Sequence, residues 1–191
     1  MINRLLVAAV VLVAAAGGGY WLKNNASSGP ADSLPDARIA FALPDLEGNV
    51  RELSEWDGTP RLVNFWATWC APCRREIPLL KKTQSEHGSD KLQVIGVAID
   101  FQEDVVAYAQ TAAFNYPILI GQEDAMAAAE MSGMDFVGLP VTMLLSGEGD
   151  LIKMHMGEIH EKHISRIIEV LDRMESGEMD LADARNALGK F

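Results

Sequence analysis

Short apolar runs alternate with amphipathic stretches through the middle of the sequence. Residues 61–67 and 92–99 are short, mostly apolar and rich in β-branched or aromatic residues, a pattern typical of buried strands. Residues 74–87 lie between them, carry apolar side chains at helical spacing and stop at Gly88, which predicts a helix. The pattern therefore predicts a strand, a helix and a second strand in succession.

The same alternation continues towards the carboxyl end. Further helices are expected at residues 104–114, 123–132 and 161–174, and further strands at 116–120, 141–145 and 151–156. Near the start, residues 41–43 and 50–53 flank a turn-rich stretch and predict a hairpin. Strands that alternate with helices indicate an α/β domain, with a central mixed sheet flanked by helices.

The first 37 residues have a different composition from the rest of the chain. Arg4 is followed by residues 5–22, which are uncharged and apolar and suit either a membrane anchor or an export signal. Ala14–Ala16 suits cleavage, whereas Tyr20 and Trp21 suit a membrane–water interface and favour a retained anchor. Both interpretations place the following domain outside the cytoplasm.

These observations predict four segments. Residues 1–23 form the anchor or signal, and residues 24–37, rich in Asn, Ser, Gly and Pro, form a flexible linker. Residues 38–175 form the folded domain, and residues 176–191 form a short tail whose apolar spacing suits a helix. The net charge of −11 and the absence of a basic stripe argue against a nucleic-acid partner.

The two cysteines of the chain stand three positions apart, as Cys70 and Cys73 in Trp-Cys-Ala-Pro-Cys. A structural disulfide at this spacing closes almost no loop and adds little stability. A zinc site needs about four ligands, and three of the four histidines lie far along the chain. A dithiol that cycles between reduced and oxidised states is the favoured interpretation, although the other two stay open at this point.

The predicted position of the pair suits thiol exchange. Only a thiolate attacks a disulfide, and the start of a helix stabilises negative charge. Pro72 fits the first helical turn because an amide there has no partner. Cys70, next to Trp69, is expected to be the exposed nucleophile, and Cys73, one turn later, the buried resolving thiol.

Several motifs resemble one family. Trp-Cys-Ala-Pro-Cys, Pro78 and the stretch Gly138-Leu139-Pro140-Val141-Thr142 resemble the thioredoxin-fold thiol–disulfide oxidoreductases. The hairpin, the sequence Cys-Arg-Arg-Glu-Ile-Pro at 73–78 and the long segment before Pro140 resemble their exported TlpA/ResA-like (DsbE-like) branch. The resemblance implies a thioredoxin fold with an N-terminal β-hairpin and a central insertion.

The resemblance also implies roles for particular residues. Pro140 is expected to be a cis-proline that faces the cysteines, and Cys70 and Cys73 are expected to form the redox-active disulfide. The expected substrate groove consists of Trp69, Ala71, Pro72 and Leu139. No cofactor and no metal site are expected, since the sulfur atoms carry the electrons.

One departure from plain thioredoxin concerns proton transfer. Asn64 occupies the strand position where thioredoxin has a buried aspartate, and an amide cannot titrate. In the ResA-like branch a glutamate three residues after the second cysteine has a comparable role, and Glu76 stands there. Glu76 is expected to handle the proton of Cys73; the alternative is an exposed residue on the helix surface.

In terms of function, the resemblance implies a periplasmic reductase of protein disulfides, tethered to the inner membrane by residues 5–22. Apocytochrome c or copper-site assembly proteins are the expected substrates, and a transmembrane electron donor of DsbD/CcdA type is the expected source of electrons. A thiol oxidase or isomerase in the same compartment is the first alternative. A copper-binding chaperone that uses the Met and His residues from Met154 to His163 is the second.

Overall fold

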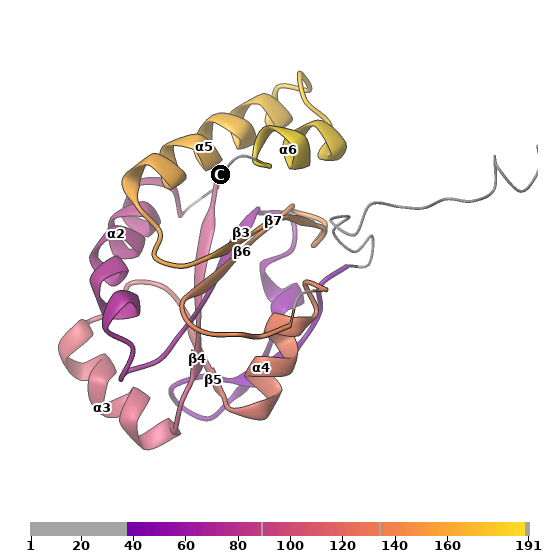
Figure 1. The fold of residues 1–191 in the computed structure, drawn as a ribbon. Helices are drawn as coiled ribbons and strands as arrows, with labels where there is room; N and C mark the ends of the chain where they lie inside the picture. The colour runs from indigo at the N-terminus through magenta and orange to yellow at the C-terminus, as the bar shows by residue number, and fades with distance from the viewer. Residues whose placement is uncertain (1–37, 89, 134, 190–191) are drawn as a thin grey trace, which may run out of the picture. The chain divides into compact units, whose positions relative to one another are not determined.

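A five-stranded mixed sheet forms the centre of the molecule (Figure 1). The computed structural model describes residues 38–88, 90–133 and 135–189. The sheet order is β5 (Ile118–Gly121), β4 (Gln93–Ile99), β3 (Arg61–Trp66), β6 (Val141–Leu145) and β7 (Leu151–Met156). β3 pairs in parallel with β4 and antiparallel with β6, so the predicted strand that precedes the cysteines lies at the centre of the sheet.

Five α-helices and a short 3-10 helix accompany the sheet in the described residues. They are η1 (Leu53–Trp56), α2 (Ala71–His87), α3 (Gln102–Ala112), α4 (Glu123–Glu130), α5 (Glu161–Glu175) and α6 (Leu181–Ala187). This thioredoxin fold confirms the predicted fold class. The segment between β4 and β6 contains α3, β5 and α4, which is the predicted central insertion.

Side chains of successive strand residues point to opposite faces of the sheet and build two separate cores. On β3, Leu62 and Trp66 join one core, while Val63 and Phe65 join the other. The first core also contains buried residues of α2, α3, α5 and α6. The second contains residues of α4 and of the N-terminal strands and η1. Asn64 lies between Leu62 and Trp66, so its side chain faces the helix α2 side.

The predicted N-terminal hairpin is present as β1 (Ala42–Pro44) and β2 (Val50–Glu52), which pair antiparallel. An isolated bridge between Asp45 and Leu119 joins this hairpin to the outer strand β5. The hairpin therefore covers one edge of the main sheet. Buried Arg61 donates hydrogen bonds to the carbonyl oxygens of Leu53, at the start of η1, and of Ser146, after β6.

Helix boundaries differ from the predicted ones by a few residues, for local reasons. α2 begins at Ala71 rather than at residue 74 because Cys70 caps it and Pro72 fits its first turn. α3 ends at Ala112 rather than at residue 114, because Ala113 has a positive φ of 47° and its amide closes the last turn.

The carboxyl-terminal segment folds onto the domain. α6 is the helix expected within residues 176–191, and Asp180 caps its amino end. Ala184 and Leu188 are fully buried in the same core as α2 and α5. Ala184 and Leu188 therefore contribute to the core that supports the cysteine helix.

The predicted anchor or signal and the linker lie outside the described residues. In the part of the chain that the structure describes, no helix is both long and apolar enough to cross a membrane.

Candidate redox site

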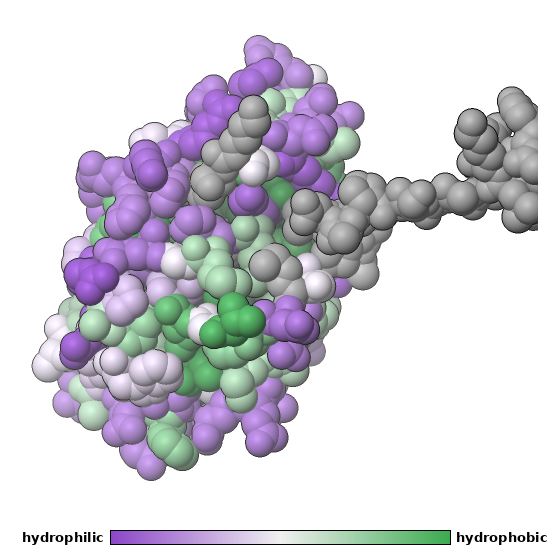
Figure 2. Space-filling model, viewed as in Figure 1, coloured by the Kyte–Doolittle hydropathy of each residue, from purple (hydrophilic) through white to green (hydrophobic). Residues whose placement is uncertain are grey.

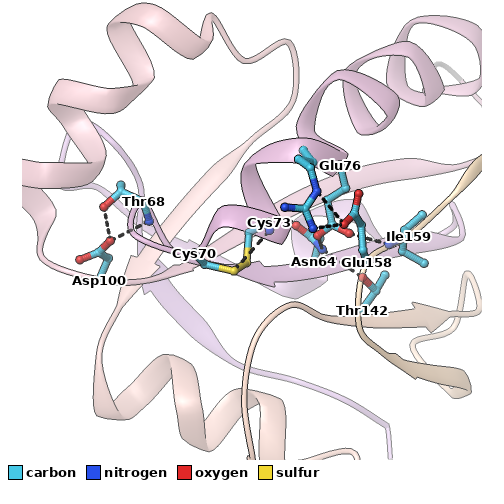
Figure 3. Close-up of a disulfide and its surroundings, with 10 residues drawn as sticks. Asn64, Thr68, Cys70, Cys73, Glu76, Asp100, Thr142, Glu158 and Ile159 are labelled. Carbon is cyan, nitrogen blue, oxygen red and sulfur yellow. Dashed lines mark hydrogen bonds and ion pairs between the residues drawn. A yellow bond between two sulfur atoms is a disulfide. The ribbon is translucent and has the colours of Figure 1, made fainter.

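Cys70 and Cys73 form a disulfide where β3 ends and α2 begins (Figure 3). Their Cα atoms are 5.3 Å apart. Cys70 is the N-cap of α2, and its sulfur accepts the amide hydrogen of Cys73 at 3.3 Å. The first sulfur thus lies where unpaired amides at the helix start stabilise a thiolate.

The two sulfur positions differ in access to solvent. Cys73 is fully buried, as predicted, whereas Cys70 keeps only 5 % of its surface exposed. The expectation of an exposed Cys70 is therefore wrong for the oxidised protein, in which Cys70 packs in the same apolar core as Cys73 and Ile77. The exposed neighbour is Trp69, with 69 % of its surface accessible.

The segment that precedes β6 carries the predicted proline. The peptide bond between Leu139 and Pro140 is cis. The Pro140 carbonyl accepts the amide of Gly157 at 2.9 Å, which fixes the start of β6 against the end of β7. Of the other expected groove residues, Ala71 is exposed, and Pro72 and Leu139 are half-buried.

A buried polar network lies on the Cys73 side of the disulfide (Figure 3). The Asn64 amide donates to a carboxylate oxygen of Glu76 at 2.8 Å and to the Thr142 hydroxyl at 3.0 Å. Asn64 on β3 and Thr142 on β6 are directly paired in the sheet, and Glu76 reaches them from α2. Glu76 is 1 % exposed, so the alternative of a surface glutamate is wrong.

The second carboxylate oxygen of Glu76 accepts the backbone amide of Ile159 at 2.6 Å. Burial raises the pKa of this carboxyl to about 7, although the hydrogen bonds from Ile159 and Asn64 oppose the rise. A carboxyl with this pKa exchanges a proton near neutral pH. The geometry and the pKa agree with the expectation for Glu76, whose role in proton transfer remains a proposal.

A second buried carboxylate lies on the opposite side of the disulfide (Figure 3). Asp100, at the end of β4, accepts the backbone amide of Thr68 at 2.8 Å and the Thr68 hydroxyl at 2.6 Å. Sequence reasoning missed both residues. The signal that could have identified Asp100 is its position, because a polar residue stands there directly after a buried strand.

The histidines near the carboxyl end do come close together. The ring centroids of His155 and His163 are 4.6 Å apart, and those of His160 and His163 are 5.5 Å apart. His163 Nδ1 accepts the His160 amide, so this ring caps α5. In the described ranges no group of three His, Cys, Asp or Glu side chains is arranged to hold a metal ion.

A thioredoxin fold with a disulfide at the start of the helix that follows its central strand, and with a cis-proline directly before β6, defines the class of dithiol thiol–disulfide oxidoreductases. The comparisons with known proteins agree. Residues 32–154 match the AhpC/TSA family. The chain belongs to this family and, within it, resembles ResA-type thiol–disulfide oxidoreductases.

Individual relatives support the same class. The chain is 33 % identical over 134 residues to the thioredoxin-like protein YneN of Bacillus subtilis, covering 68 % of this chain and 75 % of YneN. It is 30 % identical over 137 residues to the thiol-disulfide oxidoreductase ResA of Halalkalibacterium halodurans, covering 70 % and 74 %. A solved thiol:disulfide interchange protein of Chlorobium tepidum is 25 % identical, with a TM-score of 0.63 over 74 % of this chain and 99 % of that one.

Proposed function

We propose that this protein is an exported reductase of protein disulfides, tethered to the inner membrane and active in the periplasm. The observation that carries the redox chemistry is the Cys70–Cys73 disulfide at the start of α2, with Glu76 buried one turn beyond Cys73. The apolar segment at residues 5–22 supports export and tethering. Relatives named thiol-disulfide oxidoreductase ResA support the class of reaction, and the proposed substrates, proteins of cytochrome c or copper-site assembly, rest on the resemblance to the ResA-like branch.

In the reduced protein, the Cys70 thiolate attacks one sulfur of a substrate disulfide. A mixed disulfide forms, and the other substrate sulfur leaves as a thiolate. Cys73 then transfers its proton to the Glu76 carboxylate and attacks the Cys70 sulfur. The Cys70–Cys73 disulfide forms, and the substrate leaves with two reduced sulfurs and both electrons. A dithiol of a membrane electron donor of DsbD/CcdA type then reduces the disulfide again.

The direction of electron flow is tested by the reduction potential of the Cys70–Cys73 couple. The domain is equilibrated in glutathione and dithiothreitol buffers, and the fraction of disulfide is followed by tryptophan fluorescence. A potential well below that of the strongly oxidising exchange proteins, of about −120 mV, is expected for a reductase. A potential near that value contradicts the proposal and favours the thiol oxidase.

The physiological substrate can be identified by trapping its mixed disulfide with Cys70. Cys73→Ser leaves Cys70 to form the mixed disulfide but removes the thiol that resolves it. We expect a covalent complex with the substrate protein, which is absent in the Cys70→Ser, Cys73→Ser double variant. A Cys73→Ser variant that captures no protein through Cys70 contradicts the proposed class of substrate.

A further inference from the structure

The segment that presents Cys70 is a tight turn held by one buried carboxylate. The amide of Cys70 donates to the carbonyl of Ala67 at 3.2 Å, which closes a turn over residues 67–70. The amide of Thr68, the second residue of this turn, points outwards and has no partner within it. Asp100 accepts that amide, and a single oxygen of Asp100 also accepts the Thr68 hydroxyl.

Asp100 is suited to a positioning role because both of its carboxylate oxygens accept hydrogen bonds. The second oxygen accepts the amide of Phe101 at 2.9 Å. Asp100 is only 7 % exposed, and its three hydrogen bonds replace the water that a buried charge requires. One carboxylate therefore joins the cysteine turn to the segment between β4 and α3.

Each of the two joined segments carries an exposed aromatic ring. Trp69 directly follows Thr68 and Phe101 directly follows Asp100, and both rings are mostly exposed, at 69 % and 54 %. Figure 2 shows apolar surface gathered between the positions of α3 and α4 in Figure 1. Aromatic residues are enriched where proteins contact their partners.

We propose that Asp100 is a positioning residue for the reaction of Cys70 and that Phe101 contacts the partner protein. Through Thr68, Asp100 holds the turn in which the Cys70 sulfur meets the amides at the start of α2. Through its bond to the Phe101 amide, it also fixes the backbone that carries the second exposed aromatic ring. The partner is a protein segment with an apolar side chain next to the cysteine that is attacked. This role for Phe101 rests on the proposed function, whereas the effect of Asp100 on Cys70 does not.

The first test measures the alkylation rate of reduced Cys70 as a function of pH, in the full chain. Thr68→Val removes the hydroxyl donor and keeps the shape of the side chain. The sulfur is then held less firmly at the helix start, so the midpoint of the profile moves to higher pH. The rate at neutral pH is expected to fall about two- to fivefold, the scale of interactions at helix ends.

The controls separate positioning from a general loss of stability. Thr68→Ser keeps the hydroxyl and is expected to restore the parent profile. Thr111→Val makes the same chemical change at an exposed threonine of α3 and is expected to leave the profile unchanged. Asp100→Asn, which keeps one oxygen acceptor, is expected to shift the midpoint in the same direction as Thr68→Val. Parent-like profiles in both Thr68→Val and Asp100→Asn overturn the positioning role.

The second test compares a protein disulfide with a small one. Phe101→Ala is assayed with insulin and with oxidised glutathione as electron acceptors. A contact with the partner protein is expected to raise the KM for insulin at least about fivefold, with a smaller change for glutathione. Equal changes for both acceptors overturn the contact. A parent protein that does not reduce insulin contradicts the proposed function instead, and the alkylation profiles still test Asp100.

Discussion

Glu76 shows how the environment of one residue changes its chemistry. The strand position that carries a titratable aspartate in thioredoxin holds Asn64 here, and the side-chain amide donates to a carboxylate that comes from the helix. The acidic group therefore reaches the same layer of the core from a different element. Its pKa of about 7 follows first from burial, and the nearby Glu158 carboxylate adds to the rise.

Glu76→Gln removes the charge and keeps the size of the side chain. Because a nearby carboxylate disfavours a thiolate, the pKa of the cysteine thiols is expected to fall in the variant. Turnover with a protein disulfide is expected to slow by roughly 100-fold, the scale of general acid–base catalysis. Alkylation against pH and steady-state reduction of insulin measure the two effects.

The matched control is Glu86→Gln, an exposed glutamate on the same helix, which should leave both measurements unchanged. If Glu76→Gln titrates and turns over like the parent, water rather than Glu76 accepts the proton of Cys73.

The raised pKa of Glu76 also predicts how stability changes with pH. The folded protein holds this proton up to about pH 7, whereas the unfolded chain releases it near 4.5. The stability that this proton contributes is complete below pH 4.5 and is lost as the pH rises through 7. The loss is about 3 kcal/mol for a difference of roughly 2.5 pKa units.

Urea denaturation of the oxidised protein at pH 5 and at pH 8 measures this loss. The parent is expected to lose more stability between the two values than Glu76→Gln, in which no carboxyl titrates at this position. Equal losses in the parent and the variant show that the Glu76 pKa is not raised in the folded protein.

Among the helices and strands, α6 is the one whose contribution to the stability of the domain could not be predicted from the sequence. Its spacing predicts an amphipathic helix, but only the structure shows that Leu188 enters the same core as the cysteine helix. We expect Leu188→Ala to lower the free energy of unfolding by about 2–4 kcal/mol, as truncations of buried leucines do. Asn186→Ala, on the exposed side of the same helix, is expected to change it by less than about 0.5 kcal/mol.

Thermal and urea unfolding of both variants provides the measurement. Equal stability of Leu188→Ala and the parent contradicts a structural contribution of α6.

The sequence predicted most elements because buried strands and amphipathic helices leave local patterns. β6 and β7 have the predicted bounds, α2 begins three residues before the predicted start, and α3 begins and ends two residues earlier than predicted. The cysteine pair could also be recognised from the sequence, since its two residues are close in the chain. The network around Glu76 could not be, because Thr142 contacts Asn64 and Ile159 contacts Glu76 only where distant segments of the chain meet. A single sequence does not record which distant segments meet.

At the scale of the whole molecule, the domain is expected to act at a membrane surface. The apolar segment 5–22 and the linker 24–37 lie outside the described residues, so their role stays a prediction. If the anchor is retained, the full chain sediments with membranes and its mass includes residues 1–23. Fractionation and intact-mass measurement test this. A mature protein that begins near Gly17 and is found in the soluble periplasmic fraction shows a cleaved signal instead.

The hydrogen bond from Ile159 to Glu76 has a consequence for mutational scanning. The donor is a backbone amide, which nearly every amino acid supplies, so substitution of the side chain leaves it in place. In a saturation library, position 159 would resemble any buried apolar site, tolerant of Val or Leu and sensitive to charge. Only proline deletes the amide. A selective loss of redox activity in Ile159→Pro, at preserved abundance, would be the one signal by which such a library reveals this contact.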